Sequence, residues 1–390
     1  HINGENASSV DISGCKSIHF HGNINTNEMI ISTGNCSLLG SEYNISVLSV
    51  KNGTTDIRES MVSKFTEIKT VNIPQSVTLV SSSAFCKNKK LSAINVDADN
   101  KTYTSCDGVL YKMSSGKPEK LTAYPAAKPG DTYRLRYGTK IVCDNAFANA
   151  VYLKKIYLYK GITSIGSNAF AGTKNLQAVF ISGSAADIAS DAFDEGIKTL
   201  IYGIKNSYAD TYASENKIGF VKIKEYTYKF VNYDGSVISE RTGFENETVI
   251  LPQTNPSRPS TQYVAYTFAG WNGYKDGMTL DSDKVFTANY TETVEKYTYR
   301  FLDVNGNVVK KATVKAGSEI SPPSEYVPVK KSDAQYIYEF AGWRGFTDGM
   351  TINSDIDFEP IFNSVVRHYR YTFYADDGKT VIKTATAPYG

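Results

Sequence analysis

The feature that most constrains this chain is a repeat with a period of about 23 residues in its first half. Three short segments, which end at Phe147, Phe170 and Phe193, each place an apolar residue four positions ahead of an Ala-Phe pair, and their phenylalanines recur at this one spacing. A further copy ends at Phe85, and a fainter one ends one period earlier at Val62. The gap between Phe85 and Phe147 is one period plus an extra stretch of about 39 residues, so the pattern predicts a stack of equal units that one insertion interrupts.

An alternating apolar pair precedes each of these segments by a fixed distance. Its members lie 14 and 12 positions before the residue that ends the segment; the pairs are Leu48/Val50, Val71/Ile73, Tyr133/Leu135, Ile156/Leu158 and Val179/Ile181. Ile94/Val96 fits the same position after Phe85, and Leu200/Tyr202 is a last pair. Apolar residues that alternate with period two indicate a short strand with one buried face. A single unit of this size cannot build a core of its own, so we expect the strands to stack as the parallel sheet of a solenoid.

The repeated phenylalanines are expected to share the interior of the stack. We predict a ladder of rings formed by Phe85, Phe147, Phe170 and Phe193, with the small alanine before each ring leaving room for it. A ligand slot lined by the same rings is the alternative. Because periodic apolar residues are usually core, we assign these four side chains to the structural core of the repeat.

Several strings in this region form a recognisable set: Ile165 to Phe170 with Leu176, Val71-Asn72-Ile73-Pro74, and a longer unit from Val96 to Tyr111 that contains the hairpin signal Asp107-Gly108. Together they resemble the BspA-type leucine-rich repeat of bacterial surface proteins. The resemblance covers residues 45–224 and implies a leucine-rich-repeat solenoid at 46–224 with an insertion at about 97–132. Residues 1–45 depart from the repeat, and because terminal repeats of solenoids are often atypical we predict an N-terminal β cap there.

A second repeat, with a period of about 72 residues, fills the chain after position 225. The recurring strings are Tyr226–Phe230 with Tyr297–Phe301, Phe268–Trp271 with Phe340–Trp343, and a third start at Tyr371–Phe373. Asp-Gly and Asn-Gly turns and proline-rich connections between the strings predict strands. We expect small β modules at 225–295 and 296–366 and the start of a third at 367–390. Because the chain begins at His1 and ends inside that third copy, we expect a segment of a longer protein.

The Phe-Ala-Gly-Trp string of both modules resembles the Listeria–Bacteroides repeat, also called the internalin B-repeat, over residues 226–363. This resemblance implies β-grasp-like modules that stand in tandem on secreted or wall-attached bacterial proteins as spacers or weak binding units. Trp271 and Trp343 occupy one position of the repeat, and we expect each to anchor a module core; an exposed sugar-stacking platform is the alternative. The whole chain is predicted to be mainly β with short helical turns.

Composition and charge narrow the class of partner. Lys and Arg number 42 against 40 Asp and Glu, and the formal net charge of +2 gives no broad basic footprint for nucleic acid. No apolar run approaches the roughly 18 residues of a membrane span, so we expect no membrane insertion. The 28 tyrosines and 18 phenylalanines favour pleated β-structure.

The sequence gives little support for a catalytic, cofactor-binding or metal-binding site. It contains no nucleophile elbow, phosphate loop, dinucleotide fingerprint or zinc-protease helix, so we predict no catalytic residues and no cofactor. His19 and His21 alternate on one strand near Cys15, but these are too few ligands for a metal site, and we predict no metal. The five cysteines lack metal or redox spacing and are expected to be small buried residues, although a bridge between Cys15 and Cys36 stays open.

The insertion is the candidate recognition element. It is expected to protrude from the stack, and Tyr103, Tyr111, Lys112 and Tyr124 form the candidate binding surface because exposed tyrosines beside lysines are typical of protein and sugar contacts. The alternative is a hairpin that packs on the flank of the solenoid and carries no function of its own.

Together these observations favour a non-catalytic bacterial protein that is secreted or attached to the cell surface. We expect the solenoid to bind a host or cell-wall protein or glycan, with the C-terminal modules as a spacer. Two alternatives remain: a purely structural stalk or matrix element, and a non-catalytic region of a larger surface enzyme.

Overall fold

The computed structural model describes residues 2–3, 9–13, 17–21, 24–32, 37–39 and 43–390. The described chain is mainly β, and its two helices are short: α1 (Glu59–Val62) and α2 (Tyr208–Glu215). It divides into two compact units, of which the first comprises 1–230, 237–251 and 273–286, and the second 231–236, 252–272 and 287–390. Among the described residues, no helix has the length and apolar character needed to cross a membrane.

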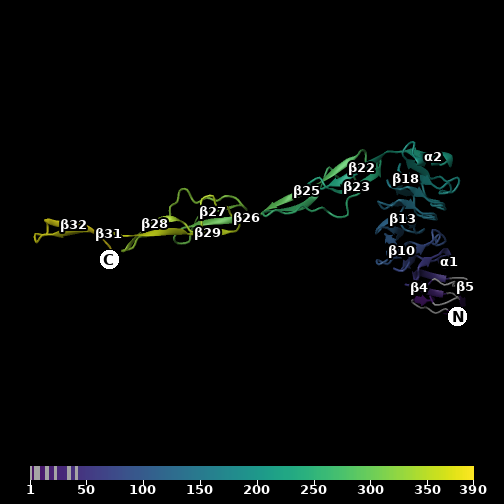
Figure 1. Ribbon diagram of the computed structural model, residues 1–390, viewed down its shortest axis with the longest axis horizontal. Helices are drawn as coiled ribbons and strands as arrows, with labels where there is room; N and C mark the ends of the chain where they lie inside the picture. Colours follow the sequence, from purple (N-terminus) through teal and green to yellow (C-terminus); the bar gives the residue numbers. More distant parts are fainter. Residues whose placement is uncertain (1, 4–8, 14–16, 22–23, 33–36, 40–42) are drawn as a thin grey trace. The chain divides into compact units, whose positions relative to one another are not determined.

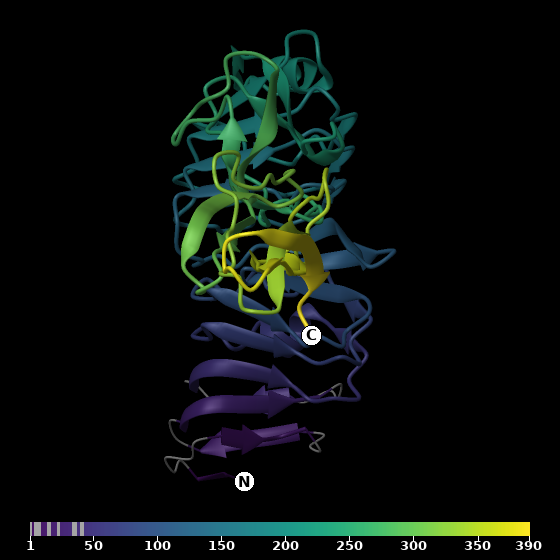
Figure 2. The same ribbon diagram turned by 90° about the vertical axis from the view of Figure 1, so that its left-hand side faces the viewer.

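The first unit is built on a solenoid, as the shorter sequence repeat predicts. Its repeating strands form two five-stranded sheets, with the orders β10-β8-β6-β4-β2 and β14-β16-β18-β20-β21, and every neighbouring pair is parallel. Successive turns stack from β4 past β10 to β18 (Figures 1 and 2). The strands are β2 (Ser9–Asp11), β4 (Ile24–Ile31), β6 (Tyr43–Val50), β8 (Thr70–Ile73) and β10 (Ala93–Val96), then β14 (Thr132–Arg134), β16 (Lys155–Leu158), β18 (Ala178–Ile181), β20 (Leu200–Gly203) and β21 (Gly219–Lys222).

Each unit also has a second, shorter strand, which the alternating pairs did not predict. It consists of the apolar residue four positions before the Ala-Phe pair and the residue before that, and it pairs in parallel with its equivalent in the next unit. The short strands are β7 (Asp56–Ile57), β9 (Leu79–Val80), β15 (Ile141–Val142), β17 (Ser164–Ile165) and β19 (Asp187–Ile188). Each turn therefore closes around a core that has strands on two sides.

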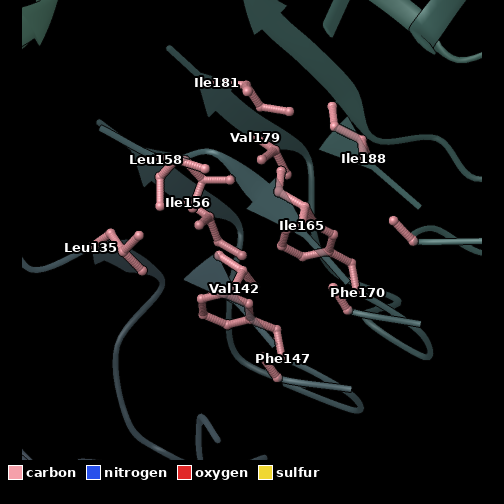
Figure 3. Close-up of a cluster of buried hydrophobic side chains, with 14 of the residues drawn as sticks. Leu135, Val142, Phe147, Ile156, Leu158, Ile165, Phe170, Val179, Ile181 and Ile188 are labelled. Atoms are coloured by element: carbon pink, nitrogen blue, oxygen red, sulfur yellow. The ribbon is translucent and has the colours of Figure 1, made fainter. Parts of the chain in front are cut away.

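The strand register places one side-chain row of each sheet in this core. In the first sheet Met29, Leu48, Val71 and Ile94 are aligned and fully buried. Ile156, Val179 and Ile201 occupy the same place in the second sheet. Figure 3 shows Ile156 and Val179 facing Val142 and Ile165 from the short strands. The alternating apolar pairs are thus the inward residues of the repeating strands, except at Leu200/Tyr202, where that expectation is wrong. There Leu200 is exposed, Tyr202 is in register with Phe180, and Ile201 between them is the buried residue.

The repeated phenylalanines are all buried, in two adjacent clusters. The Phe147 and Phe170 rings, labelled in Figure 3, stack with centroids 5.5 Å apart. Phe170 and Phe193 stack at 4.5 Å. Phe85 belongs to the N-terminal cluster instead, and Tyr124 occupies the place before Phe147, with a centroid distance of 5.3 Å. The ladder is therefore continuous over three rings, and the insertion separates it from the fourth.

The N-terminal segment shares the architecture of the repeats that follow. The described strands β2 and β4 pair in parallel with each other, and β4 pairs with β6, so one sheet continues across residue 45. A second parallel sheet joins β1 (Ile2–Asn3), β3 (Ser17–His21) and β5 (Ser37–Leu39). Among the described residues, the stack thus continues toward the N-terminus beyond the position where the N-terminal β cap was expected to end.

The insertion does not protrude, and that expectation is wrong. Its strands β11 (Tyr103–Cys106), β12 (Val109–Ser114) and β13 (Lys117–Ala123) form an antiparallel meander, and β13 pairs in parallel with β15. Asp107 and Gly108 both have positive φ, 53° and 74°, as the predicted two-residue hairpin turn requires. Because buried apolar side chains of β12 and β13 enter the core of the stack, the meander becomes part of the solenoid wall.

The tandem modules are small β sheets. The first has the order β23-β22-β25-β24 and the second the orders β27-β26-β29 and β28-β30, with β29 parallel to β26. No helix lies between residues 225 and 390. A final hairpin joins β31 and β32. Their bounds are β22 (Glu225–Val231), β23 (Val237–Phe244), β24 (Val264–Asn272), β25 (Lys284–Val294), β26 (Lys296–Leu302), β27 (Val308–Lys315), β28 (Tyr336–Trp343), β29 (Ile356–Phe358), β30 (Pro360–Val366), β31 (His368–Tyr374) and β32 (Val381–Pro388).

The two tryptophans differ in burial. Trp343 is buried in the core of the second module, where its ring lies edge-on 4.9 Å from that of Phe301. Trp271 is half-buried and packs edge-on against Phe268 at 5.3 Å. Trp343 therefore has the place of the expected core anchor, whereas Trp271 keeps part of its ring in solvent.

Candidate functional site

The three tyrosines of the predicted binding surface are buried. Tyr103, Tyr111 and Tyr124 are 2%, 0% and 5% exposed, so the prediction that they form an exposed surface is wrong. The Tyr103 hydroxyl accepts a hydrogen bond from the Val80 backbone N–H at 2.9 Å. Lys112 is half-buried, and its ammonium lies 5.9 Å from the centre of the Tyr103 ring. These side chains have a packing role because the meander joins the wall of the stack.

The hydroxyl group of Tyr111 lies in the core and is hydrogen-bonded there. Its hydroxyl and that of Tyr133 lie 2.6 Å apart and form a hydrogen bond in which either can donate. Burial raises the pKa of Tyr111 to about 12, and the phenol therefore stays protonated at neutral pH. The fully buried Tyr111 ring is not available to a ligand in this structure.

A polar row lies on the outer face of the first sheet, with Asn95 exposed and Ser49 and Asn72 half-buried. The register aligns Ser49, Asn72 and Asn95 on β6, β8 and β10, pointing away from the core; we call these three residues the open polar row. The Asn95 side-chain amide donates to Oδ1 of Asn72 at 3.1 Å, and the Asn72 amide donates to Oγ of Ser49 at 3.0 Å. The Ser49 hydroxyl donates in turn to the Glu28 carboxylate. These hydrogen bonds run along the stack and hold the row in one conformation.

The rest of this outer face is small, polar or charged. The neighbouring outward row includes Val47, Thr70 and Ala93, none of which projects far from the sheet. At the edge, the Lys51 ammonium contacts the Asp11 carboxylate at 3.4 Å. Hydrogen bonds from Ser13, assisted by Lys51, hold the pKa of Asp11 below its usual range. The face thus offers amide and hydroxyl groups beside the Glu28 carboxylate and the Asp11–Lys51 pair.

The outer face of the second sheet is different, because it carries an aromatic row. Tyr157, Phe180 and Tyr202 are aligned on β16, β18 and β20, and their rings stack at 4.3 and 4.6 Å; we call them the aromatic row. The Arg134 guanidinium lies over the Tyr157 ring at 4.8 Å. Sequence reasoning missed both rows. The residue between the two members of an alternating pair could have shown all of them except Tyr202, which was itself taken as a member of a pair.

The remaining predicted groups give no site. Cys86, Cys106 and Cys143 are free and half-buried, and burial raises the pKa of each thiol. Cys15 and Cys36 lie outside the described residues, as do the side chains of His19 and His21. Within the described part of the chain, no group of three or more His, Cys, Asp or Glu is placed to hold a metal ion.

A shallow pocket of about 260 Å³ lies on the second module, between Val309, Lys310 and residues 323–326. The Lys310 ammonium donates to the carbonyl oxygens of Ser321 and Pro322 at 2.7 and 3.1 Å. Its charge is thus used to hold the proline-rich connection.

Comparison with protein families identifies the repeat. A family model described as the BspA type leucine rich repeat region matches six copies, over residues 12–106 and 132–232. The break between the two ranges falls within the insertion. The resemblance of residues 226–363 to the Listeria–Bacteroides repeat stays a prediction. No curated protein matches the chain.

Solved structures include similar bacterial proteins. A leucine-rich repeat protein from Eubacterium ventriosum is 20% identical, with coverage of 49% of this chain and 60% of that chain and a TM-score of 0.38. A leucine rich cell surface protein from Faecalibacterium prausnitzii is 16% identical, with coverage of 55% and 82% and a TM-score of 0.33. The pneumococcal vaccine antigen PcpA is 16% identical, with coverage of 56% and 79% and a TM-score of 0.29. At these identities the likeness extends no further than the fold.

Proposed function

Because the chain belongs to the BspA-type leucine-rich repeat family, we propose that it is a non-catalytic bacterial protein of the cell surface or the extracellular space. Its solenoid adheres to a protein or glycan through the outer face of the first sheet, and the later C-terminal modules act as a spacer. The observation that carries this function is the open polar row, Ser49, Asn72 and Asn95, in register on the outer face of the first sheet.

The open polar row has hydrogen-bonding capacity to spare. Each asparagine amide has two N–H donors and a carbonyl oxygen with two lone pairs, and the hydrogen bonds along the row use only part of this capacity. None of the three residues contributes an apolar side chain to the core. The polar groups that remain are free to exchange hydrogen bonds with a partner.

The geometry of the face suits an extended, regularly spaced partner. Parallel strands lie about 4.8 Å apart, so equivalent side chains recur at that interval along the stack. Solenoids present large and rigid surfaces of this kind, whose shape changes little on binding. An exposed peptide segment or a glycan chain, both of which carry polar groups at short regular intervals, matches such a surface.

Binding of the full chain to an array of purified matrix proteins, cell-wall fragments and glycans tests this function. The informative variant is Asn72→Arg with Asn95→Arg, which puts two bulky charges on the face and leaves the core row untouched. The matched control is Asn363→Arg with Ser364→Arg, which adds the same charge at exposed positions of β30. We expect the first variant to lose at least tenfold in signal on every spot that wild type binds, and the control to keep it.

Two results would overturn this function. Equal binding by wild type and by the Asn72/Asn95 variant would place recognition elsewhere on the chain. Absence of wild-type binding to every spot would favour the purely structural role of a stalk or matrix element.

A further inference from the structure

The aromatic row of the second sheet is covered by the first C-terminal module. We propose that this row is a docking surface whose partner is the end of β23 and the turn that follows it, so that the first module caps the solenoid and does not serve as a spacer. The division into compact units agrees, since residues 237–251 and 273–286 group with the solenoid. The proposal is independent of which ligand the open polar row binds.

An apolar anchor makes the first part of this contact. Phe244, the last residue of β23, is fully buried, and its ring centroid lies 5.6 Å from that of Phe180 and 6.1 Å from that of Tyr157. Tyr159, beyond the end of β16, lies 6.0 Å away on the same side. One ring of the module thus contacts three rings that would otherwise face solvent on the sheet, and aromatic clusters of this kind are strongly stabilising.

A buried carboxylate three residues later makes the second part. The Glu247 side chain is only 3% exposed, and Nε of Arg134 donates to Oε1 at 3.1 Å. The Tyr159 hydroxyl donates to the same oxygen, and the Phe244 backbone N–H donates to Oε2 at 3.1 Å. Because a buried carboxylate is costly unless donors surround it, Glu247 can be accommodated only where the solenoid places Arg134 and Tyr159. This requirement fixes the orientation of the docked segment.

The connection between solenoid and module adds further contacts. The hydroxyl of Ser182, which is itself buried, donates to the Glu225 carboxylate at the start of β22 at 2.7 Å. The Ile223 N–H donates to the Gly203 carbonyl at 2.9 Å, so the chain leaves the last turn hydrogen-bonded to it. The connection is thus held against the final turns of the stack.

The second module shows that these docking groups are not part of the module fold. The last residue of β27 is Lys315 where β23 ends in Phe244, and the residue three positions later is Ser318 in place of Glu247. The backbone is nevertheless alike, because Asn246 and Gly317 take the same positive φ, 65° and 77°. Lys315 is exposed. The docking residues are thus specific to the one module that follows the solenoid.

Hydrogen–deuterium exchange of the full chain at increasing urea concentration tests the docking. The variant Phe244→Lys with Glu247→Ser gives the first module the residues of the second. In wild type we expect peptides from β16–β18 and from β22–β23 to lose protection in one transition. In the variant we expect β22–β23 to open at lower urea, and peptides covering Tyr157 and Phe180 to exchange at least tenfold faster before the solenoid unfolds.

Controls keep this test decisive. Lys315→Ala with Ser318→Ala changes the equivalent positions of the second module and should leave both transitions unchanged. Arg134→Met removes the guanidinium that donates to Glu247 and adds no charge, and it should give a smaller shift in the same direction if the double variant fails to fold. The proposal is overturned if β22–β23 and β16–β18 already open separately in wild type, or if they still open together in both docking variants.

Discussion

The two halves of the solenoid have the same kind of apolar core, but the side chains on their outer faces differ in chemical character. Inward residues of both sheets are aligned apolar side chains that are fully buried, such as Val71 in the first half and Val179 in the second. The outward row of the first half is polar and open, whereas that of the second half is aromatic and covered by Phe244. The difference shows that stacking fixes only the inward positions, and the outward ones are left to recognition or to docking.

The largest predicted effect on stability comes from truncating a core side chain, and it tests whether core packing contributes equally in both halves of the solenoid. Leu48→Ala in the first half should cost about 2–5 kcal/mol of unfolding free energy and Phe170→Ala in the second about 3–5 kcal/mol, because each leaves a cavity in a packed column. Urea unfolding followed by circular dichroism measures both. If either substitution cost less than about 1 kcal/mol, the stacked core would be in doubt at that turn.

The next largest effect concerns the outer face of the second sheet, which the first module is proposed to cover. Phe180→Ala should destabilise the chain by about 2 kcal/mol, since the ring is half-buried between Tyr157 and Tyr202 and is also covered by Phe244. The same urea titration gives the value. An effect no larger than that of an ordinary surface substitution would contradict the docking of the first module on this row.

An alkaline titration probes the core where the two halves meet. Burial raises the pKa of Tyr111 from about 10 to about 12. Below pH 10 the phenol is protonated in both states and stability is complete; between pH 10 and 12 the unfolded chain ionises first, so stability falls as pH rises, by about 2–3 kcal/mol from this group. The Tyr111→Phe variant should therefore lose less stability than wild type over this interval. Parallel curves for the two proteins would show that the phenol is not buried.

The smallest effect on stability belongs to the open polar row. Asn72→Ala removes two hydrogen bonds that water can replace, and it should change the unfolding free energy by less than about 1 kcal/mol. The same substitution should weaken adhesion to the spots that wild type binds. A large loss of stability with unchanged adhesion would assign the row a structural role instead.

Sequence reasoning was most successful where a local pattern reflects a single structural requirement, such as the stacking of repeats or the backbone conformation of a turn. The shorter repeat period predicted the stack, and Asp107-Gly108 predicted a hairpin whose turn residues both have positive φ. It could not place that hairpin, because the parallel pairing of Leu121 with Val142 depends on which side of the stack the meander meets. Tyr103 and Tyr111 are buried because of the side on which the meander pairs with the stack, and no local sequence pattern indicates that side.

The docking of the first module had a sequence signal that was not used. Copies of one module differ at Phe244 and Lys315, and an apolar residue that appears in only one copy indicates a contact outside the repeat. The aromatic row had a similar signal, since Tyr157, Phe180 and Tyr202 follow the shorter repeat period to within one position. Residues that are shared by all copies of a repeat therefore predict the fold, whereas residues that differ between copies predict contacts outside the repeat.

The most direct test of the account is a hydrogen–deuterium exchange footprint of the full chain, with and without the matrix protein or glycan that binds most strongly on the array. The account predicts added protection in peptides from β6, β8 and β10, and unchanged exchange in β16–β18 and in the second module. Protection confined to the second module or to the aromatic row, with none on the first sheet, would contradict it.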